Sequence, residues 1–199
     1  MNRFYRIAYS IIAPLIRLFF PHRAVGLENL PEGGALLCAN HVSGWDPFLI
    51  AVALPIDSRL TVMAKDQLFH IPVVGWFLRK VGVFPVKRGG NDLTAMKTAI
   101  RALSGGNRLL VFPEGTRVEG EGSGEAKGGV TVMATRTGVP MVPVYCGPKH
   151  KFLRRTTIVF GEPYTPVIAG RRPTAEENRQ AAEEIMRRIY ALSGVNGWK

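Results

Sequence analysis

Short apolar runs alternate with amphipathic segments along most of the chain. Six of these runs predict strands: Ala35–Ala39, Leu60–Ala64, Val81–Val86, Arg108–Phe112, Pro140–Cys146 and Thr156–Phe160. The segments between them predict helices: Pro47–Leu54, Val73–Lys80, Leu93–Leu103 and Gly129–Thr137. Strands that alternate with helices are typical of a single α/β domain with a mostly parallel or mixed central sheet flanked by helices.

The last predicted helix has a clear N-terminal signal. Thr174 and Glu177 have the spacing of a capping box, in which each side chain binds a backbone N–H of the other residue. Apolar residues then follow at helical spacing along one face: Ala182, Ile185, Met186, Ile189 and Leu192. The pattern therefore predicts an amphipathic C-terminal helix.

The N-terminal segment is strongly apolar but short. Only Ile7–Ile16, with Pro14 inside it, separates Arg6 from Arg17, whereas a spanning helix needs roughly 20 apolar residues. No small-residue cleavage site of a signal peptide follows. A helix in the membrane interface and a helix packed on the domain are the alternatives, and the aromatic residues near both ends favour the interface. The predicted organisation is a membrane-associating helix followed by one domain: residues 1–23 and residues 24–199.

Charge and cysteine content narrow the class of protein. The chain has 26 Lys and Arg against 15 Asp and Glu, a net charge of +11, which favours an anionic partner such as nucleic acid, a phosphorylated substrate or an acidic membrane. The charge alone does not choose among these. Cys38 and Cys146 lie far apart inside apolar runs, which predicts buried thiols and not a disulfide.

Motif spacing argues against several kinds of site. The Gly-rich stretch before Lys127 lacks the spacing of a phosphate-binding loop, because Gly128 follows that lysine. No G-x-S-x-G sequence offers a serine nucleophile. The four histidines are not spaced as metal ligands, so we expect no metal. The basic stretch Lys149–Arg155 is not part of a recognisable nucleic-acid-binding module, so we expect no nucleic acid partner.

The stretch "NHVSGWDP" holds the first candidate site. His41 and Asp46 are five residues apart, which is wrong for one face of a helix. The spacing works if His41 ends a strand and Asp46 begins the next helix, with Ser43 and Gly44 in the turn and Pro47 at the first helical position. The alternative is that Asp46 merely caps the helix and His41 is a loop residue.

Two further predicted strands end in polar residues. "VGVFPVKRGG" ends in Lys87 and Arg88, and "LLVFPEGTR" ends in a turn that contains Gly115, Thr116 and Arg117. Ligands in α/β proteins bind at the carboxyl ends of strands. Two arginines, with the backbone and hydroxyl donors beside them, would suit a phosphate group. The alternative for either arginine alone is an ordinary solvated side chain.

Together these blocks resemble the glycerolipid acyltransferases, specifically the 1-acyl-glycerol-3-phosphate (lysophosphatidate) acyltransferases with the HxxxxD motif. The blocks of this family stand in order between Ala35 and Gly161: "NHVSGWD", "GVFPVKR", "FPEGTR" and "VPMVPV". The resemblance implies transfer of a fatty acyl chain from acyl-CoA or acyl-carrier protein to the hydroxyl of lysophosphatidate. The product would be phosphatidic acid for phospholipid biosynthesis. The reaction would need no bound cofactor.

The resemblance also implies roles for individual residues. His41 matches the general base of the family, and Asp46 matches the carboxylate that orients it. Other residues match the positions that bind the phosphorylated acceptor: Arg88, Glu114, Gly115, Thr116 and Arg117. The loop after the third block departs from the family pattern, because it is acidic and Gly-rich and keeps only Lys127 as an additional candidate ligand.

The expected chemistry requires only one positioned imidazole, which takes the hydroxyl proton and returns it to the thiolate leaving group. Both lipids reside in membranes, so we expect a peripheral or monotopic enzyme on an anionic membrane surface, at the cytoplasmic face of the cell membrane. Two alternatives remain at this point. One is a related acyltransferase that uses glycerol 3-phosphate or a lyso-aminolipid as acceptor. The other is a non-catalytic basic module that binds anionic lipid or nucleic acid.

Overall fold

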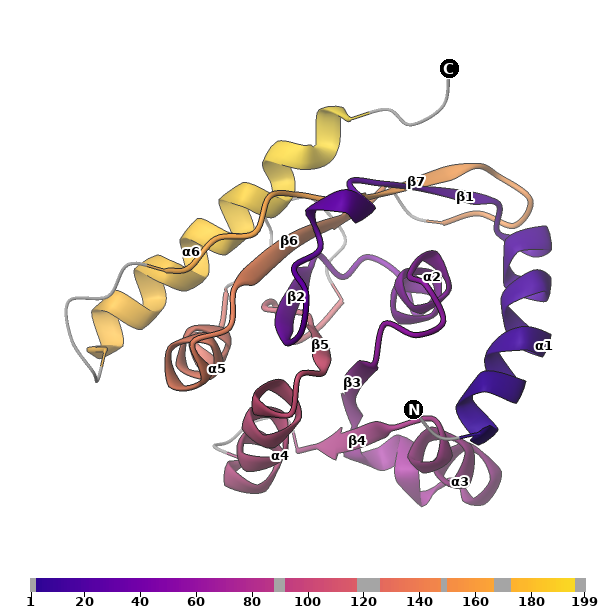
Figure 1. Ribbon diagram of the computed structural model, residues 1–199, viewed down its shortest axis with the longest axis horizontal. Coiled ribbons are helices and arrows are strands. Elements are labelled where there is room, and N and C mark those ends of the chain that lie inside the picture. Colours follow the sequence, from indigo (N-terminus) through magenta and orange to yellow (C-terminus); the bar gives the residue numbers. More distant parts are fainter. Residues whose placement is uncertain (1–2, 88–91, 118–125, 148–149, 167–172, 196–199) are drawn as a thin grey trace.

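The structure is a computed structural model, and it describes residues 3–87, 92–117, 126–147, 150–166 and 173–195. The strands in these residues are β1 His22–Val25, β2 Ala35–Ala39, β3 Leu60–Lys65, β4 Val83–Val86, β5 Arg108–Val111, β6 Met141–Cys146 and β7 Thr156–Phe160. They form one seven-stranded sheet in the order β1-β7-β6-β2-β5-β3-β4 (Figure 1). Adjacent strands are parallel except for β6 and β7. The predicted mixed sheet is therefore confirmed.

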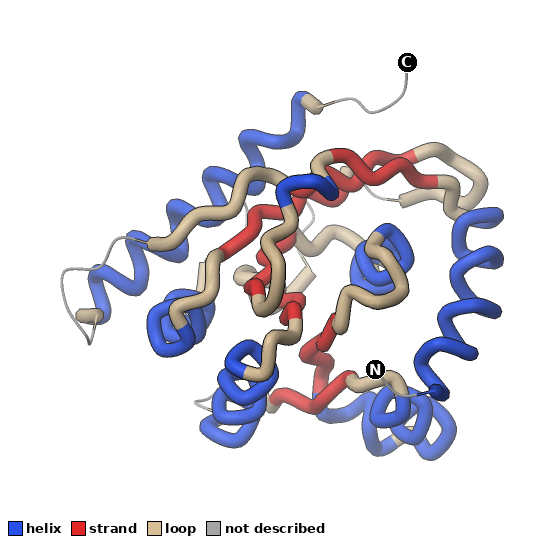
Figure 2. Tube along the Cα trace, viewed as in Figure 1, coloured by secondary structure: helices blue, strands red, loops and turns tan. Residues whose placement is uncertain are grey.

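Helices cover both faces of this sheet (Figure 2). Their bounds are α1 Arg3–Phe19, α2 Asp46–Ala53, α3 Pro72–Lys80, α4 Leu93–Ser104, α5 Gly129–Thr137 and α6 Ala175–Ala191. The α1 and α2 helices lie on one face, and α4, α5 and α6 lie on the other. The predicted capping box is present at the start of α6.

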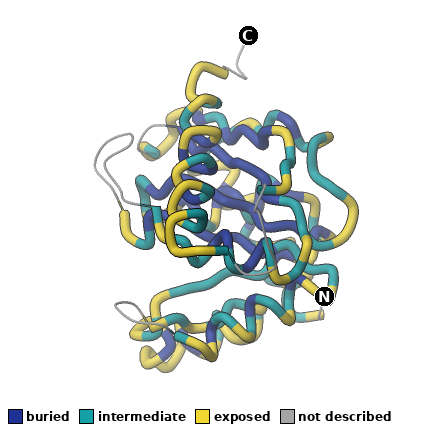
Figure 3. The backbone as a smooth tube through the Cα atoms, turned by 90° about the vertical axis from the view of Figure 1, so that its left-hand side faces the viewer, coloured by how far each residue is buried: buried dark blue, intermediate teal, exposed yellow. Residues whose placement is uncertain are grey.

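The hydrophobic core has two halves, one on each face of the sheet. Along β2, Leu37 and its alternate neighbours face α1 and α2, whereas Leu36 and Cys38 face α4, α5 and α6. Because both faces of β2 are covered, its sequence is a continuous apolar run and not an alternating one. Figure 3 shows this buried centre between partly exposed helices. Cys38 and Cys146 are free, buried thiols, as predicted.

The β1 strand is the one element in the described sheet that the sequence pattern does not predict. Its four residues, His22–Val25, pair in parallel with β7, which lies more than 130 residues later in the chain. Because the partner strand is distant in the sequence, this short, half-polar segment has no strand pattern of its own. The predicted boundary at residue 23 passes through this strand, and the preceding helix already ends at Phe19.

The α1 helix packs on the domain along one face and leaves its other face exposed. On its inner face Ala13 and Ile16 are buried in the core. The hydroxyl of Tyr9 donates to the Leu54 carbonyl at 2.9 Å, and Nη2 of Arg17 donates to the Val52 carbonyl at 2.8 Å. An apolar stripe on the other face is exposed: Ile7, Ile11, Leu15, Leu18 and Phe19. Among the described residues, no helix has both the length and the hydropathy to cross a bilayer.

Candidate active site

The polar residues of the site lie where neighbouring parallel strands end. His41 follows β2, Glu114 follows β5 and His150 follows β6, and these three strands are adjacent in the sheet. Because β2 is parallel to both β5 and β6, the three carboxyl ends meet at the same edge. Residues separated by more than 100 positions in the chain are thereby brought to one place.

His41 and Asp46 are in direct contact. Nδ1 of His41 lies 2.8 Å from Oδ2 of Asp46, which is completely buried. The backbone N–H groups of Val42 and Ser43 also donate to Oδ2, each at 2.8 Å. Trp45 occupies the N-cap position of α2, and the carboxylate of Asp46 points back to the preceding loop. The Asp46 side chain therefore does not cap α2, whereas His41 does lie in the loop after β2.

The hydrogen bonds around Asp46 determine which nitrogen of His41 carries the proton. Burial raises the pKa of Asp46, but hydrogen bonds from His150, His41 and the Ser43 N–H outweigh burial and lower it. An ionised carboxylate only accepts hydrogen bonds, so Nδ1 of His41 donates and Nε2 keeps its lone pair. Nε2 has no hydrogen bond with another described residue, and the side chain is 11% exposed. Its ring stacks on Phe112 at a centroid distance of 4.1 Å. This imidazole is arranged to accept a proton.

Two buried polar residues hold the loop that carries His41. Asn40 donates to the Cys146 carbonyl at 3.0 Å and accepts from the Cys146 N–H at 2.7 Å, which ties the end of β2 to β6. The carboxylate of Glu114 accepts from the His41 N–H at 2.9 Å and from the hydroxyl of Tyr190 at 2.7 Å. Leaving such a buried group without its partner costs about 1–3 kcal/mol. Both contacts therefore favour a fixed position for the imidazole.

The structure adds one residue that the sequence motifs do not identify. Nε2 of His150 lies 2.8 Å from Oδ1 of Asp46, and the His150 side chain is only 1% exposed. In the sequence, His150 belongs to the basic stretch after β6 and has no motif of its own. Only the adjacency of β2 and β6 would have indicated His150. The sequence motifs do not give that adjacency, because it depends on the order of strands in the sheet.

Of the predicted phosphate ligands, Arg117 lies close to the loop that carries His41, and Lys127 lies close to the turn after β5. A Cβ atom at Gly44 would lie 3.9 Å from Nη1 of Arg117. A Cβ atom at Gly115, which has a positive φ of 69°, would lie 3.0 Å from Nζ of Lys127. Thr116 is exposed on the same turn. Arg88 lies outside the described residues.

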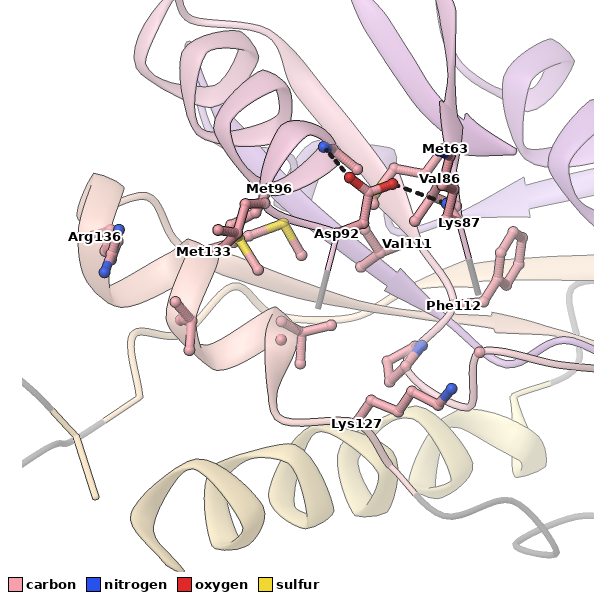
Figure 4. A pocket seen from close by; sticks show the side chains of 17 residues that line it. Met63, Val86, Lys87, Asp92, Met96, Val111, Phe112, Lys127, Met133 and Arg136 are labelled. Atoms are coloured by element: carbon pink, nitrogen blue, oxygen red, sulfur yellow. Dashed lines mark hydrogen bonds between the residues drawn. The ribbon is translucent and has the colours of Figure 1, made fainter. Parts of the chain in front are cut away.

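A largely apolar cavity of about 520 Å³ opens between α4, α5 and the strands β4 and β5 (Figure 4). Phe112, which stacks on the His41 ring, is part of its wall. Methionines from three elements also line it: Met63, Met96 and Met133. Thioether side chains adapt to flexible apolar ligands. The volume is within the usual range for ligand pockets, about 300–1,000 Å³.

One group of described residues has the chemical types of metal ligands. Side-chain atoms of Asp46, Cys146 and His150 lie within 4.8 Å of one another. However, Asp46 and His150 are joined by a 2.8 Å hydrogen bond, whereas ligand atoms on one tetrahedral zinc ion are about 3.3 Å apart. Burial and the charge of Asp46 also raise the pKa of the Cys146 thiol well above its usual value. The arrangement does not fit a metal site.

Comparisons with known proteins match most of this chain. The family described as Acyltransferase matches residues 22–147. A 1-acyl-sn-glycerol-3-phosphate acyltransferase of Bacillus subtilis is 32% identical over 171 residues, 83% of this chain and 84% of that protein. A chloroplastic 1-acyl-sn-glycerol-3-phosphate acyltransferase of Brassica napus is 32% identical over 152 residues, which are 72% of this chain. The chain spans only 43% of that longer relative.

A solved structure extends the similarity to the whole fold. The crystal structure of the 1-acyl-sn-glycerophosphate acyltransferase PlsC from Thermotoga maritima matches with a TM-score of 0.68 and 26% identity. The match covers 100% of this chain and 86% of that chain. The chain therefore belongs to the acyltransferase family.

Proposed function

We propose that the protein transfers a fatty acyl chain from acyl-CoA or acyl-carrier protein to the free hydroxyl of 1-acyl-glycerol 3-phosphate, which gives phosphatidic acid. The contact between His41 and Asp46 beside an apolar cavity carries this proposal. The names of the relatives from Bacillus subtilis and Brassica napus support the same acceptor.

In the proposed reaction His41 acts as general base and then as general acid. Its Nε2 takes the proton of the acceptor hydroxyl while that oxygen attacks the thioester carbonyl. When the tetrahedral intermediate collapses, the C–S bond breaks and Nε2 returns the proton to the thiolate leaving group. Asp46 holds the Nδ1–H tautomer and stabilises the imidazolium that forms between these steps. No acyl-enzyme is required, because the attacking group is the substrate hydroxyl.

The cavity beside Phe112 would hold the acyl chain of the donor. Its walls are mostly apolar, and its methionines come from β3, α4 and α5. A chain bound there would have its thioester end close to the His41 ring, because Phe112 touches both the cavity and that ring. Burial of a hydrocarbon chain contributes roughly 0.8 kcal/mol per methylene group.

The acceptor phosphate would bind between Arg117 and Lys127. Both cations are exposed near the turn after β5, and neither has an ion-pair partner among the described residues. Arg88 remains a proposed third ligand. Glu114 is better suited to support, because its buried carboxylate already accepts from His41 and Tyr190 and would repel a phosphate.

Arg117→Ala is expected to raise the KM for lysophosphatidate roughly 10- to 100-fold, since a hydrogen bond to a charged group contributes about 1.5–3 kcal/mol. The KM for the acyl donor should change little. Arg117→Lys should recover part of the loss, because lysine keeps the charge but not the two-pronged geometry. Steady-state kinetics with each substrate varied would measure this, with Arg101→Ala on the exposed side of α4 as control. Equal losses for both substrates would contradict a phosphate-binding role.

The proposed function is tested by thiol release. Purified protein is incubated with acyl-CoA and, in separate reactions, with lysophosphatidate, glycerol 3-phosphate or a lyso-aminolipid. Release of free thiol with lysophosphatidate above all other acceptors is the expected result. Preference for another acceptor would indicate a related acyltransferase. No release with any acceptor, under conditions where the protein is folded, would favour a non-catalytic binding module.

We further propose that the protein binds a membrane surface through α1 and the loop at residues 150–155. Phe152 is 60% exposed, and its ring stacks on Phe19 at 5.5 Å, so it extends the exposed apolar stripe of α1. Lys151 and Arg154 beside it are exposed cations. Apolar side chains flanked by basic residues are typical of helices and loops that lie in the interface of an anionic membrane.

Ile11→Ser combined with Leu18→Ser is expected to weaken binding to anionic vesicles about tenfold or more per position, because both side chains are exposed and would enter the membrane. Deleting α1 is not an adequate test, since its inner face is part of the core. Co-sedimentation would measure binding, with the exposed Val195→Ser as control. Activity on bilayer substrate should fall more than activity on a short-chain monomeric substrate. Unchanged sedimentation would show that this stripe is not the membrane contact.

A further inference from the structure

His150 is a buried histidine whose only hydrogen bond within the described residues is to Asp46. Nε2 of His150 contacts Oδ1 at 2.8 Å, while the other oxygen, Oδ2, receives the three donors from the loop of His41. From the described residues Asp46 thus accepts four hydrogen bonds, of which His150 supplies the only one to Oδ1. Without it, one oxygen of a completely buried carboxylate would have no donor.

The surroundings of His150 indicate which of its nitrogens carries a proton. Nε2 must donate, because the carboxylate of Asp46 only accepts. Nδ1 is buried and has no hydrogen-bond partner among the described residues. An unpaired N–H would be costly there, whereas an unpaired lone pair on a neutral ring costs less. The geometry therefore places the proton that His150 donates on Nε2.

The groups that face His150 come from three other elements. Asp46 belongs to α2, Cys146 to β6 and His22 to β1. Burial raises the pKa of the Cys146 thiol and lowers the pKa of His22, so both favour their uncharged forms. Asp46 is thus the one charged group among these neighbours.

The loop of His150 is held in place from outside the active site. The N–H of Leu153 donates to the Phe19 carbonyl at 2.7 Å, and the N–H of Thr156 donates to the Pro21 carbonyl at 3.0 Å. The backbone on the C-terminal side of His150 is therefore fixed to the end of α1 and the start of β1. A histidine on such a loop has little freedom to leave Asp46.

We propose that His150 is a positioning residue that acts on His41 through Asp46. Its N–H holds Oδ1, so that Oδ2 remains directed at Nδ1 of His41, and it draws part of the carboxylate charge away from the imidazole. This proposal rests on the proposed acyl transfer with His41 as base. It assigns His150 no contact with substrate. The arrangement is a His–Asp–His chain in which only the first histidine meets the reacting atoms.

Removing His150 should change both the rate and its pH dependence. His150→Ala is expected to lower kcat on the order of 10- to 100-fold, because a small displacement of a catalytic group has effects of this size. The KM of either substrate should stay close to the wild-type value. With one donor fewer, Asp46 would stabilise the protonated form of His41 more strongly. The acidic limb of the kcat profile should therefore move to higher pH.

Two further variants separate positioning from packing. His150→Gln keeps a side-chain N–H donor and should recover much of kcat and the wild-type pH profile. His150→Phe keeps a ring of similar size without a donor, so it should behave like His150→Ala. His70→Ala is the matched control, since His70 contacts Asp66 at 3.1 Å in an exposed pair. Melting temperatures of all variants would identify those that have lost the fold.

Nuclear magnetic resonance of the histidine rings gives a readout that does not depend on activity. We expect the His41 ring to titrate at higher pH in His150→Ala than in the wild type. If wild-type protein releases no thiol, acyl transfer is wrong and this titration still tests the His–Asp–His chain. Wild-type kcat, pH profile and His41 titration in His150→Ala would overturn the positioning role. Equal losses in the Gln, Phe and Ala variants, without a pH shift, would also overturn it in favour of packing.

Discussion

His41→Ala is expected to lower kcat on the order of 100- to 10,000-fold, which is the usual contribution of a positioned acid–base group. In the proposed mechanism the imidazole both removes the hydroxyl proton and returns a proton to the thiolate, so no other described side chain at this edge would replace it. Its hydrogen bond to Asp46 is 2.8 Å, and its Nε2 is the nitrogen available to substrate. Thiol release at saturating concentrations of both substrates would measure the loss.

The control for this variant must show that the fold and the acceptor site remain. The His41 side chain is only 11% exposed and donates to the buried carboxylate of Asp46, so the variant should lose about 1–3 kcal/mol of stability, and its melting temperature shows whether it remains folded. Binding of lysophosphatidate, measured by calorimetry without donor, should persist because Arg117 and Lys127 are unchanged. His70→Ala, in an exposed His–Asp pair, should keep full activity. Turnover close to wild type in His41→Ala would exclude it as the base.

Asp46→Asn is expected to lower kcat by up to about 10,000-fold, since the equivalent change in a Ser-His-Asp triad leaves the imidazole in the wrong tautomer. Asp46 accepts four hydrogen bonds from described residues. The NH₂ group of an asparagine would face some of these donors and could not accept from them. The variant should also lose stability, by about 1–3 kcal/mol for each buried donor left unpaired. A kcat comparison at equal folded fraction, determined by circular dichroism, separates the two effects. Normal turnover in a folded variant would contradict the orienting role.

The same substitution should change how stability depends on pH. The pKa of Asp46 is lower in the folded protein than its usual value, because the hydrogen bonds that stabilise the carboxylate outweigh burial. Such a group stabilises the fold above its unfolded pKa of about 3.9, and this contribution is lost as pH falls through the folded value. Asp46→Asn should therefore flatten the decline of unfolding free energy below about pH 4. Denaturant unfolding across this range would measure it.

Local patterns were sufficient to predict most elements of the fold. The strands at Ala35–Ala39 and Thr156–Phe160 begin and end where predicted, as does the α5 helix at Gly129–Thr137. Apolar periodicity and capping are properties of neighbouring residues, so a single sequence displays them. The strand β1 lacks such a signal, since it forms only where β7 offers a distant backbone partner.

The residues of the candidate site likewise divide into those that short-range spacing indicates and those that depend on distant neighbours. Five-residue spacing between a strand end and a helix start permitted a contact between His41 and Asp46, and the family resemblance indicated it, because a short loop limits where both side chains can lie. The roles of the other two polar residues depend on neighbours far away in the chain. Glu114 contacts the backbone of His41 across 73 residues, and His150 contacts Asp46 across 104 residues.

The sequence by itself therefore determined most strand and helix segments, the α/β class and the motif that holds His41 and Asp46, since each depends on short-range periodicity or spacing. Only the tertiary structure decided the strand order and which face of α1 is packed and which is exposed. It also decided the contact of Glu114 with the His41 backbone and the contact of His150 with Asp46. These features depend on which strand ends become neighbours in the sheet. That adjacency follows from the packing of the whole chain, because the parallel strands β2, β5 and β6 end at one edge although they are far apart in sequence.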